Sequence, residues 1–307
     1  MLDEEIPTFW RSLGIPGLID IHVHFMPDRV QEKVWSFFDT VGPRTGIDWS
    51  ISYRLSDAVR LELLRAWGVR AFPALSYPHK SDMAAWLNGW ALGFADAEPD
   101  VVRAGTFFPE PSATDYVAAA LEDGVRIFKA HLQVGGYDPR DRLLQPVWGQ
   151  LTDACVPVVV HCGSGPAPGA FTGPGPIGDV LAAHPRLTLV VAHLGMPEYA
   201  DFLALAESYP AVHLDTTMAF TDFTERIAPF PPALRPRLAD LADRIVLGAT
   251  SRRSRTPTLI SWRRWRGSTS GRSGCVECAG ATEPASWAST RHRLPPDDRF
   301  RHQAAPG

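Results

Sequence analysis

The chain has 307 residues, 45% of them hydrophobic and 21% charged, so it can bury a full core as two small domains or as one α/β barrel of about 250 residues. Its formal net charge of −4 gives no electrostatic attraction for nucleic acid, and the sequence has no run of about 18 apolar residues that would cross a bilayer. We therefore expect neither nucleic acid nor a membrane as a partner.

The first residues and the cysteines indicate the compartment. Residues 1–5, Met-Leu-Asp-Glu-Glu, are acidic and lack the apolar core of a signal peptide. The four cysteines, at positions 155, 162, 275 and 278, do not resemble a disulfide framework in a chain of this size. We expect a cytoplasmic protein.

Short β-branched runs alternate with longer stretches rich in alanine and leucine. The expected strands are Gly17–His24, Val69–Leu75, Val102–Phe107, Val125–His131, Val156–His161, Leu187–His193, Ala211–Thr216 and Arg244–Gly248. The expected helices include Leu55–Trp67, Ser81–Phe94, Ala113–Glu122, Pro139–Ala154, Pro197–Ser208 and Pro232–Leu241. Gly68 and Gly124 supply the stops expected between a helix and the next strand.

Near-continuous apolar strands separated by helices are typical of parallel strands buried on both faces. Eight such units with short loops predict a (β/α)8 TIM-type barrel over residues 1–249. A doubly wound open sheet is the alternative, but no glycine-rich dinucleotide turn follows the first strand.

The pair His22 and His24 ends the first expected strand. Side chains at i and i+2 of a strand point to the same face, so both imidazoles would project from one strand end. Zinc and its neighbours in the transition series bind imidazole nitrogen readily. Three further histidines, His131, His161 and His193, end the fourth, fifth and sixth strands. In a barrel these ends meet at one mouth, so the sequence predicts one cluster of histidines there.

Three segments carry a family resemblance: Ile19-Asp20-Ile21-His22-Val23-His24, Val158-Val159-Val160-His161-Cys162-Gly163 and Val190-Val191-Ala192-His193-Leu194-Gly195. With the barrel rhythm between them, residues 15–248 resemble the amidohydrolase superfamily. The similarity is to the amidohydrolase-related branch that contains aminocarboxymuconate-semialdehyde decarboxylase and related decarboxylases, lactonases and hydratases.

The resemblance implies a metal-dependent hydrolase or carboxy-lyase that acts on a small carboxylated or carbonyl-containing metabolite through a metal-activated water. By this resemblance His22, His24 and His161 would bind one divalent ion, zinc foremost with manganese as an alternative. His193 would be the catalytic base or polarising group. Lys129 and His131 share one face of the fourth strand and would contact the substrate. The alternative for Lys129 is the carboxylated lysine that bridges two metals in binuclear members of the superfamily, whereas the decarboxylase-like branch is typically mononuclear. A homodimer is a further expectation.

One family feature is missing after the eighth strand. The family carries an aspartate there, in a Gly-Ser/Thr-Asp-Phe-Pro setting, whereas this chain continues from Gly248 with Ala-Thr-Ser-Arg-Arg. From residue 250 the composition changes to clusters of Arg, Ser, Thr, Gly and Trp without the apolar spacing of a closing helix. We expect residues 250–307 to form a poorly ordered tail.

The genetic code suggests an origin for this tail. If the last base of each codon is read with the first two of the next, Gly248 through Ser254 can encode Ser-Asp-Phe-Pro-Pro-Ile-Pro. With the same shift, Gly280 through Trp287 can encode Arg-Asn-Gly-Ala-Arg-Leu-Leu, which resembles the family's closing helix. Our hypothesis is that a frameshift near residue 248 produced the tail; a basic anion-binding arm is the alternative.

The missing aspartate leaves two other functional interpretations open. The chain would be a catalytically impaired barrel that still binds metal weakly, or a small-molecule binding barrel without chemistry. Activity with added Zn²⁺ or Mn²⁺ separates the enzyme from both.

Overall fold

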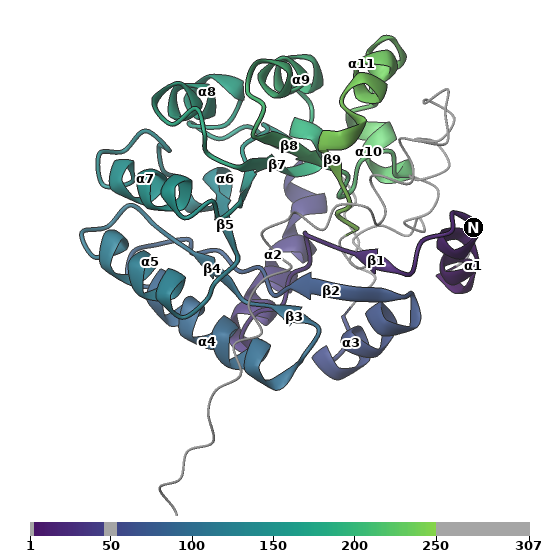
Figure 1. The fold of residues 1–307 in the computed structure, drawn as a ribbon, viewed down its shortest axis with the longest axis horizontal. Coiled ribbons are helices and arrows are strands. Elements are labelled where there is room, and N and C mark those ends of the chain that lie inside the picture. The colour runs from purple at the N-terminus through teal and green to yellow at the C-terminus, as the bar shows by residue number, and fades with distance from the viewer. Residues whose placement is uncertain (1–2, 46–53, 250–307) are drawn as a thin grey trace, which may run out of the picture.

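The computed structural model describes residues 3–45 and 54–249 and is an α/β fold of parallel strands surrounded by helices (Figure 1). One sheet has the order β1 (Leu18–Ile19), β2 (Val69–Pro73) and β3 (Val101–Val102). The second sheet has the order β4 (Ala104–Thr106), β5 (Ile127–His131), β6 (Val158–His161), β7 (Leu189–Val191), β8 (Val212–Asp215) and β9 (Ile245–Val246). Every neighbouring pair within them is parallel.

The two sheets are parts of one barrel. Only Arg103 separates β3 from β4, so these two short strands occupy a single position in the strand order. At the other junction the backbone N–H of Ile21, just after β1, donates to the carbonyl of Leu247, just after β9, at 3.0 Å. The predicted (β/α)8 barrel is therefore confirmed.

Most helices lie outside the strands in a ring, whereas α2 overlaps the centre of the barrel in this view (Figure 1). The α-helices are α1 (Ile6–Ser12), α2 (Asp28–Thr45), α3 (Asp57–Ala66), α4 (Ala84–Ala97), α5 (Ala113–Glu122), α6 (Leu132–Gly135), α7 (Gln145–Asp153), α8 (Pro174–Ala183), α9 (Tyr199–Ser208), α10 (Asp222–Ile227) and α11 (Arg235–Asp240). Short 3-10 turns are η1 (Asp3–Glu5), η2 (Ala192–Gly195), η3 (Pro232–Leu234) and η4 (Ala242–Arg244). As expected, Gly68 and Gly124 have positive φ of 84° and 81° before the next strand.

Strand alternation divides the apolar residues between two cores. The barrel interior contains a small cluster of residues in or just after the strands: Leu75, Ala104, Ile127, Val159, Val190 and Ala192, with Ile21, Val102 and Val246 packed against it. The flanking residues Val158 and Val160 instead join the large core between strands and helices. Residues two apart on a strand face the same way, so Lys129 and His131 follow Ile127 into the interior.

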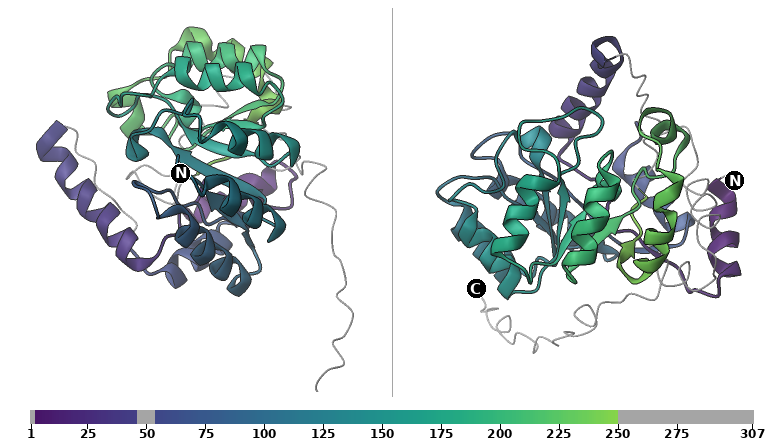
Figure 2. Two further views of the ribbon diagram at one scale, coloured as in Figure 1. Left: turned by 90° about the vertical axis from the view of Figure 1, so that its left-hand side faces the viewer. Right: turned by 90° about the horizontal axis from the view of Figure 1, so that it is seen from above.

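Helices α1, α2, α6, α8 and α10 are not among the helices named from the sequence, and the first two lie at or near the start of the barrel. Helix α1 packs at the start of β1, where the indole N–H of Trp10 donates to the carbonyl of Trp67 at 2.9 Å. Helix α2 stands away from the barrel on one side (Figure 2). Its Phe37 is exposed, whereas the neighbouring Phe38 packs against the buried side chains of Met218 and Phe223.

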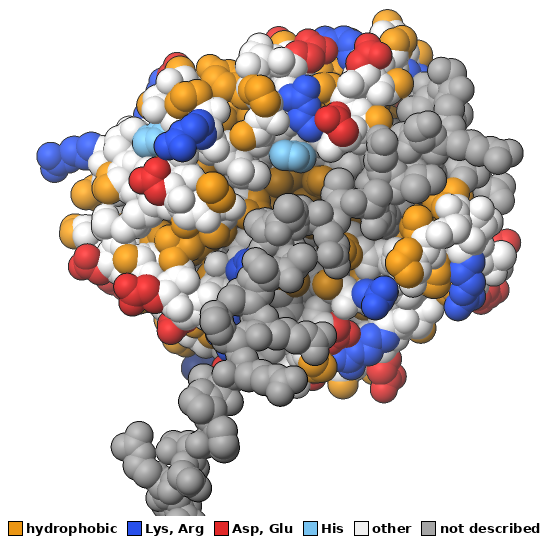
Figure 3. All heavy atoms as spheres, in the orientation of Figure 1, with side chains coloured by type: hydrophobic (Ala, Val, Ile, Leu, Met, Phe, Trp, Pro, Cys, Tyr) orange, Lys and Arg blue, Asp and Glu red, His pale blue; other side chains and the backbone are white. Residues whose placement is uncertain are grey.

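Charged side chains of both signs are interspersed over the face shown in Figure 3. Among the described residues several charged side chains form ion pairs: Arg65 binds Glu98 and Asp100, and Arg140 binds Asp138 and Asp179. None of the helices that the structure describes is long and apolar enough to span a membrane. The predicted tail lies outside the described residues.

Candidate active site

The chemistry-bearing side chains meet at the carboxyl ends of the strands. His22 and His24 follow β1, Lys129 and His131 are in β5, and His161 is the last residue of β6; His193 follows β7 and Asp215 ends β8. All seven side chains are buried, with 0–9% of their surface exposed. The mouth predicted from sequence therefore does bring these residues together.

His22 and His24 face each other through their Nε2 atoms, which are 3.1 Å apart. The Nδ1 atom of His24 lies 3.0 Å from the carbonyl oxygen of Leu75, and Nδ1 of His22 lies 2.7 Å from a carboxylate oxygen of Asp215. Both partners are acceptors, so Nδ1 carries the proton in both rings. Each Nε2 therefore presents a lone pair, which is the form that binds a metal ion.

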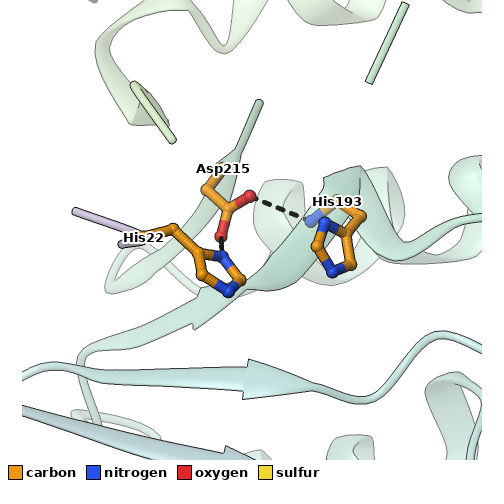
Figure 4. Close-up of side chains that lie close together, drawn as sticks. All are labelled: His22, His193 and Asp215. Atoms are coloured by element: carbon orange, nitrogen blue, oxygen red, sulfur yellow. Dashed lines mark hydrogen bonds and ion pairs between the residues drawn. The ribbon is translucent and has the colours of Figure 1, made fainter. Parts of the chain in front are cut away.

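His193 has the same arrangement. Its Nδ1 donates to the carbonyl of Thr217 at 2.9 Å, which leaves Nε2 as the acceptor. Its ring stacks beside that of His22 with centroids 5.2 Å apart (Figure 4). Burial, together with positive charge on His161 or His22, holds the pKa of His193 well below its ordinary value. His193 is therefore a neutral imidazole near neutral pH.

The backbone at His193 has an unusual form. His193 and Leu194 have positive φ of 59° and 53°, and Gly195 follows at 73°. Non-glycine residues rarely adopt this left-handed region, and it persists where surrounding contacts hold it. Here the N–H of His193 donates to Asp215 at 3.0 Å.

One group of residues could hold a metal ion in the described part of the chain. One ligand atom from each of His22, His193 and Asp215 lies within 4.8 Å of the other two (Figure 4). With Nε2 of His24 beside Nε2 of His22, the cluster offers several imidazole nitrogens in a buried setting, next to the carboxylate of Asp215. This donor set suits zinc or another divalent first-row metal.

His161 and His131 lie beside this cluster with the opposite arrangement of ring protons. They are register partners on β6 and β5, and their rings stack with centroids 4.0 Å apart. Nε2 of His161 donates to the carbonyl of Gly165 at 3.0 Å, which leaves Nδ1 as its acceptor. Nδ1 of His131 accepts the N–H of Val134 at 3.3 Å, which leaves Nε2–H as a donor. Burial is the main reason why the pKa of His131 is well below its ordinary value.

Lys129 places its ammonium group inside the cluster. The side chain is completely buried, and Nζ lies 3.3 Å from Nε2 of His22. An ammonium group only donates, so this contact agrees with a lone pair on Nε2 of His22. The contact also shows that the imidazole lone pairs are directed at a position where positive charge is accepted, and on this observation the residues fit a bound cation.

Asp20 lies beside the cluster and binds the backbone of two of its neighbouring segments. Its buried carboxylate accepts the backbone N–H of His22 at 3.0 Å and that of Ala249 at 3.1 Å. Burial raises the pKa of Asp20 to about 7, against the opposing effect of these two hydrogen bonds. Asp20 thereby links the end of β1 to the chain that leaves β9.

Sequence reasoning gave no role to Asp215. The residue ends β8, as the histidines end their own strands, so its position at the carboxyl end of a barrel strand was an available signal. Its contacts with His22 and His193 depend on the closure of the barrel and could not be read from spacing. The family aspartate expected after the eighth strand does not occur at Gly248 or Ala249. The residues that follow Ala249 lie outside the described part of the chain.

Comparison with known proteins assigns the family. Residues 19–249 match the family model described as Amidohydrolase, which covers most of the chain. The chain therefore belongs to the amidohydrolase family, as its three sequence segments predicted. No curated protein sequence matches it significantly.

Solved structures share the fold at low sequence identity. An uncharacterized TIM-barrel protein from Bordetella bronchiseptica has a TM-score of 0.65 at 19% identity, covering 86% of this chain and 95% of that one. A 5-carboxyvanillate decarboxylase from Novosphingobium aromaticivorans, complexed with manganese and 4-hydroxy-3-methoxy-5-nitrobenzoic acid, has 0.54 at 13%, covering 90% and 96%. A probable 2-pyrone-4,6-dicarboxylic acid hydrolase from Acinetobacter baumannii, with citric acid bound, has 0.54 at 12%, covering 85% and 95%.

Proposed function

We propose that the chain is a metal-dependent hydrolase or decarboxylase that acts on a small carboxylated or carbonyl-containing metabolite. The observation that carries this proposal is the approach of Nε2 of His22 and Nε2 of His24 to 3.1 Å, with both side chains buried and both Nδ1 atoms engaged by acceptors. Two imidazoles held in this way are a ligand pair. Family membership agrees with this proposal.

The proposed ligands are His22 and His24, with His161 as the third imidazole that the family resemblance implies. A divalent ion bound there, such as Zn²⁺ or Mn²⁺, supplies Lewis-acid polarisation and makes water a stronger nucleophile near neutral pH. The carboxyvanillate decarboxylase structure contains manganese, which supports Mn²⁺ as one of these two metals.

His193 is the proposed general base or acid. Its Nδ1–H is committed to the carbonyl of Thr217, so a proton moves on and off at Nε2. The contact from Asp215 to the backbone of His193 fixes where this ring stands. The low pKa of His193 keeps its base form available.

Lys129 and His131 are the proposed substrate contacts. The ammonium group of Lys129 and the Nε2–H of His131 are donors on one face of β5, as a carboxylate or carbonyl oxygen requires. The two related structures whose names give a reaction, one a decarboxylase and one a probable hydrolase, bind carboxylated molecules. We therefore infer a carboxylate on the substrate.

One observation favours the alternative of an impaired barrel. The two residues that follow Leu247, Gly248 and Ala249, bring no carboxylate to the cluster, although their backbone passes beside it. The protein would then bind metal without turnover.

The experiment that tests the proposal is a metal-dependent screen with the full chain. The purified protein is stripped with a chelator, reloaded with Zn²⁺ or Mn²⁺, and assayed over lactones, amides and aromatic or unsaturated carboxylic acids. The proposal expects turnover that appears only with metal and is lost in the double variant His22→Ala, His24→Ala. Metal binding without turnover would support the impaired barrel, and neither binding nor turnover would contradict both.

A further inference from the structure

Asp215 is a fully buried carboxylate at the end of β8 with its two oxygens engaged by different partners. Oδ1 accepts two backbone N–H groups, from His193 at 3.0 Å and from Thr217 at 2.9 Å. Oδ2 lies 2.7 Å from Nδ1 of His22 (Figure 4). A single side chain therefore joins the ends of three strands: β1, β7 and β8.

The two backbone donors fix the orientation of the carboxyl group. An oxygen must occupy the Oδ1 position, because two N–H groups point at it and an amide nitrogen there would face both donors. Only the second position, which faces His22, can change its hydrogen-bonding character when the residue is replaced by its isosteric amide.

The second position sets the proton on His22. A carboxylate oxygen at 2.7 Å accepts from Nδ1–H, so Nε2 is left with its lone pair. The ammonium group of Lys129, 3.3 Å from Nε2, is compatible only with this tautomer. His24 and His193 reach the same tautomer through backbone carbonyls, whereas His22 depends on a side chain.

We propose that Asp215 is the positioning residue that holds His22 in the Nδ1–H tautomer, and so makes Nε2 of His22 available for a metal ion, while its other oxygen holds the His193 turn. The metal part of this proposal rests on the proposed function; the tautomer part does not. Carboxylate partners of ligand histidines orient the ring and raise its basicity, and their loss costs metal affinity about 10–100-fold.

The variant Asp215→Asn separates the two roles. Its amide oxygen remains against the N–H groups of His193 and Thr217, so the backbone stays anchored. Its NH₂ group then faces Nδ1 of His22, and His22 must take the Nε2–H tautomer, in which Nε2 cannot bind a metal ion. Asp215→Ala removes both roles, and Asp179→Asn is a matched control at an exposed ion pair with Arg140.

The test has three measurements on the full chain. Histidine ¹⁵N chemical shifts of the metal-free protein report the tautomer of His22, with its resonances identified by their loss in His22→Gln. Calorimetric titration with Zn²⁺ reports affinity, and thermal melting reports folding.

We expect the Nδ1–H tautomer of His22 in the wild type and in Asp179→Asn, and the Nε2–H tautomer in Asp215→Asn. We expect Asp215→Asn to bind Zn²⁺ at least tenfold more weakly and to stay folded, with a smaller fall in melting temperature than Asp215→Ala, which also loses the backbone anchor. The Nδ1–H tautomer persisting in Asp215→Asn would overturn the proposal. If the wild type binds no Zn²⁺, the proposed function fails, and the ¹⁵N shifts alone still decide the role of Asp215.

Discussion

The side-chain nitrogen of Lys129 lies 3.3 Å from Nε2 of His22, although 107 residues separate the two in sequence. The contact exists because β5 and the end of β1 both direct side chains into one barrel mouth. It places the only buried lysine of the described residues against a proposed metal ligand. We therefore expect the metal ion and the substrate to bind at adjacent positions in one small site.

The first prediction concerns the ligand pair. The double variant His22→Ala, His24→Ala removes two strong nitrogen donors, so we expect the folded protein to lose its bound divalent ion. Elemental analysis of protein purified with added Zn²⁺ measures this. The control is His184→Ala, which removes an imidazole that contacts Gln145 outside the cluster. Equal metal content in the double variant and the wild type would refute the site.

The second prediction separates His161 from His193. We expect His161→Asn to lose most bound Zn²⁺, and His193→Asn to keep most of it while turnover falls by roughly 10²-fold or more, the usual effect of losing acid–base assistance. Metal content and kcat are measured on the same preparations. If instead His193→Asn loses the Zn²⁺ and His161→Asn keeps it, His193 is the third ligand. The structure allows this outcome, because Nε2 of His193 carries a lone pair whereas Nε2 of His161 contacts Gly165.

Some features of the site could be predicted from the sequence and others could not. His22 and His24 could be placed at a shared site because strand geometry and barrel topology are both local patterns repeated along the chain. The contact of Asp215 with His22 could not, since it depends on how the barrel closes between residues 193 positions apart. The tautomers of His24 and His193 could not be predicted either, because they depend on single backbone carbonyls, those of Leu75 and Thr217.

The turn η2 shows a different limit of the sequence. The expected strand Leu187–His193 is shorter in the structure, where β7 ends at Val191 and His193 stands in a left-handed turn. Nothing in the apolar run signals this turn, which is held by the backbone contact to Asp215.

The third prediction concerns Lys129. Replacing it with Met removes the ammonium group and keeps an unbranched side chain in the buried position. A charge-assisted hydrogen bond contributes roughly 1.5–3 kcal/mol, so KM for a carboxylated substrate should rise about tenfold or more. The matched comparison is the methyl ester of the same substrate, for which we expect little change. An equal rise for acid and ester would argue against a carboxylate contact.

The fourth prediction is a pH dependence of stability that arises from Asp20. Its pKa is about 7 in the folded protein, against an ordinary value of 3.8, so the unfolded chain releases this proton at lower pH than the folded chain. The stability that Asp20 contributes is therefore fully present below about pH 4 and is lost as the pH rises to about 7. The variant Asp20→Asn cannot ionise, and its amide oxygen can still accept from His22 and Ala249.

We therefore expect Asp20→Asn to gain stability relative to the wild type as the pH is raised from 5 to 8. Urea unfolding of both proteins at the two pH values measures the difference. A difference that stays constant over this range would show that Asp20 has no raised pKa in the folded state.

The last prediction concerns the reading frame beyond residue 248. The hydrogen bond from Ile21 to Leu247 shows that the strands close, and a Cβ atom built on Gly248 would lie 3.0 Å from Cβ of His22. The shifted frame would place an aspartate two residues after Gly248, close to the cluster, and would supply an apolar closing helix. At about 25 cal/mol per Å², covering several hundred Å² of apolar surface contributes several kcal/mol, which is comparable to the total stability of a domain.

We expect the encoding DNA of independent isolates to carry the shifted frame, and the restored protein to be more soluble, more resistant to protease and more active with metal than the 307-residue chain. An uninterrupted present frame in those isolates, together with a soluble and fully active 307-residue chain, would contradict the frameshift and the need for that aspartate.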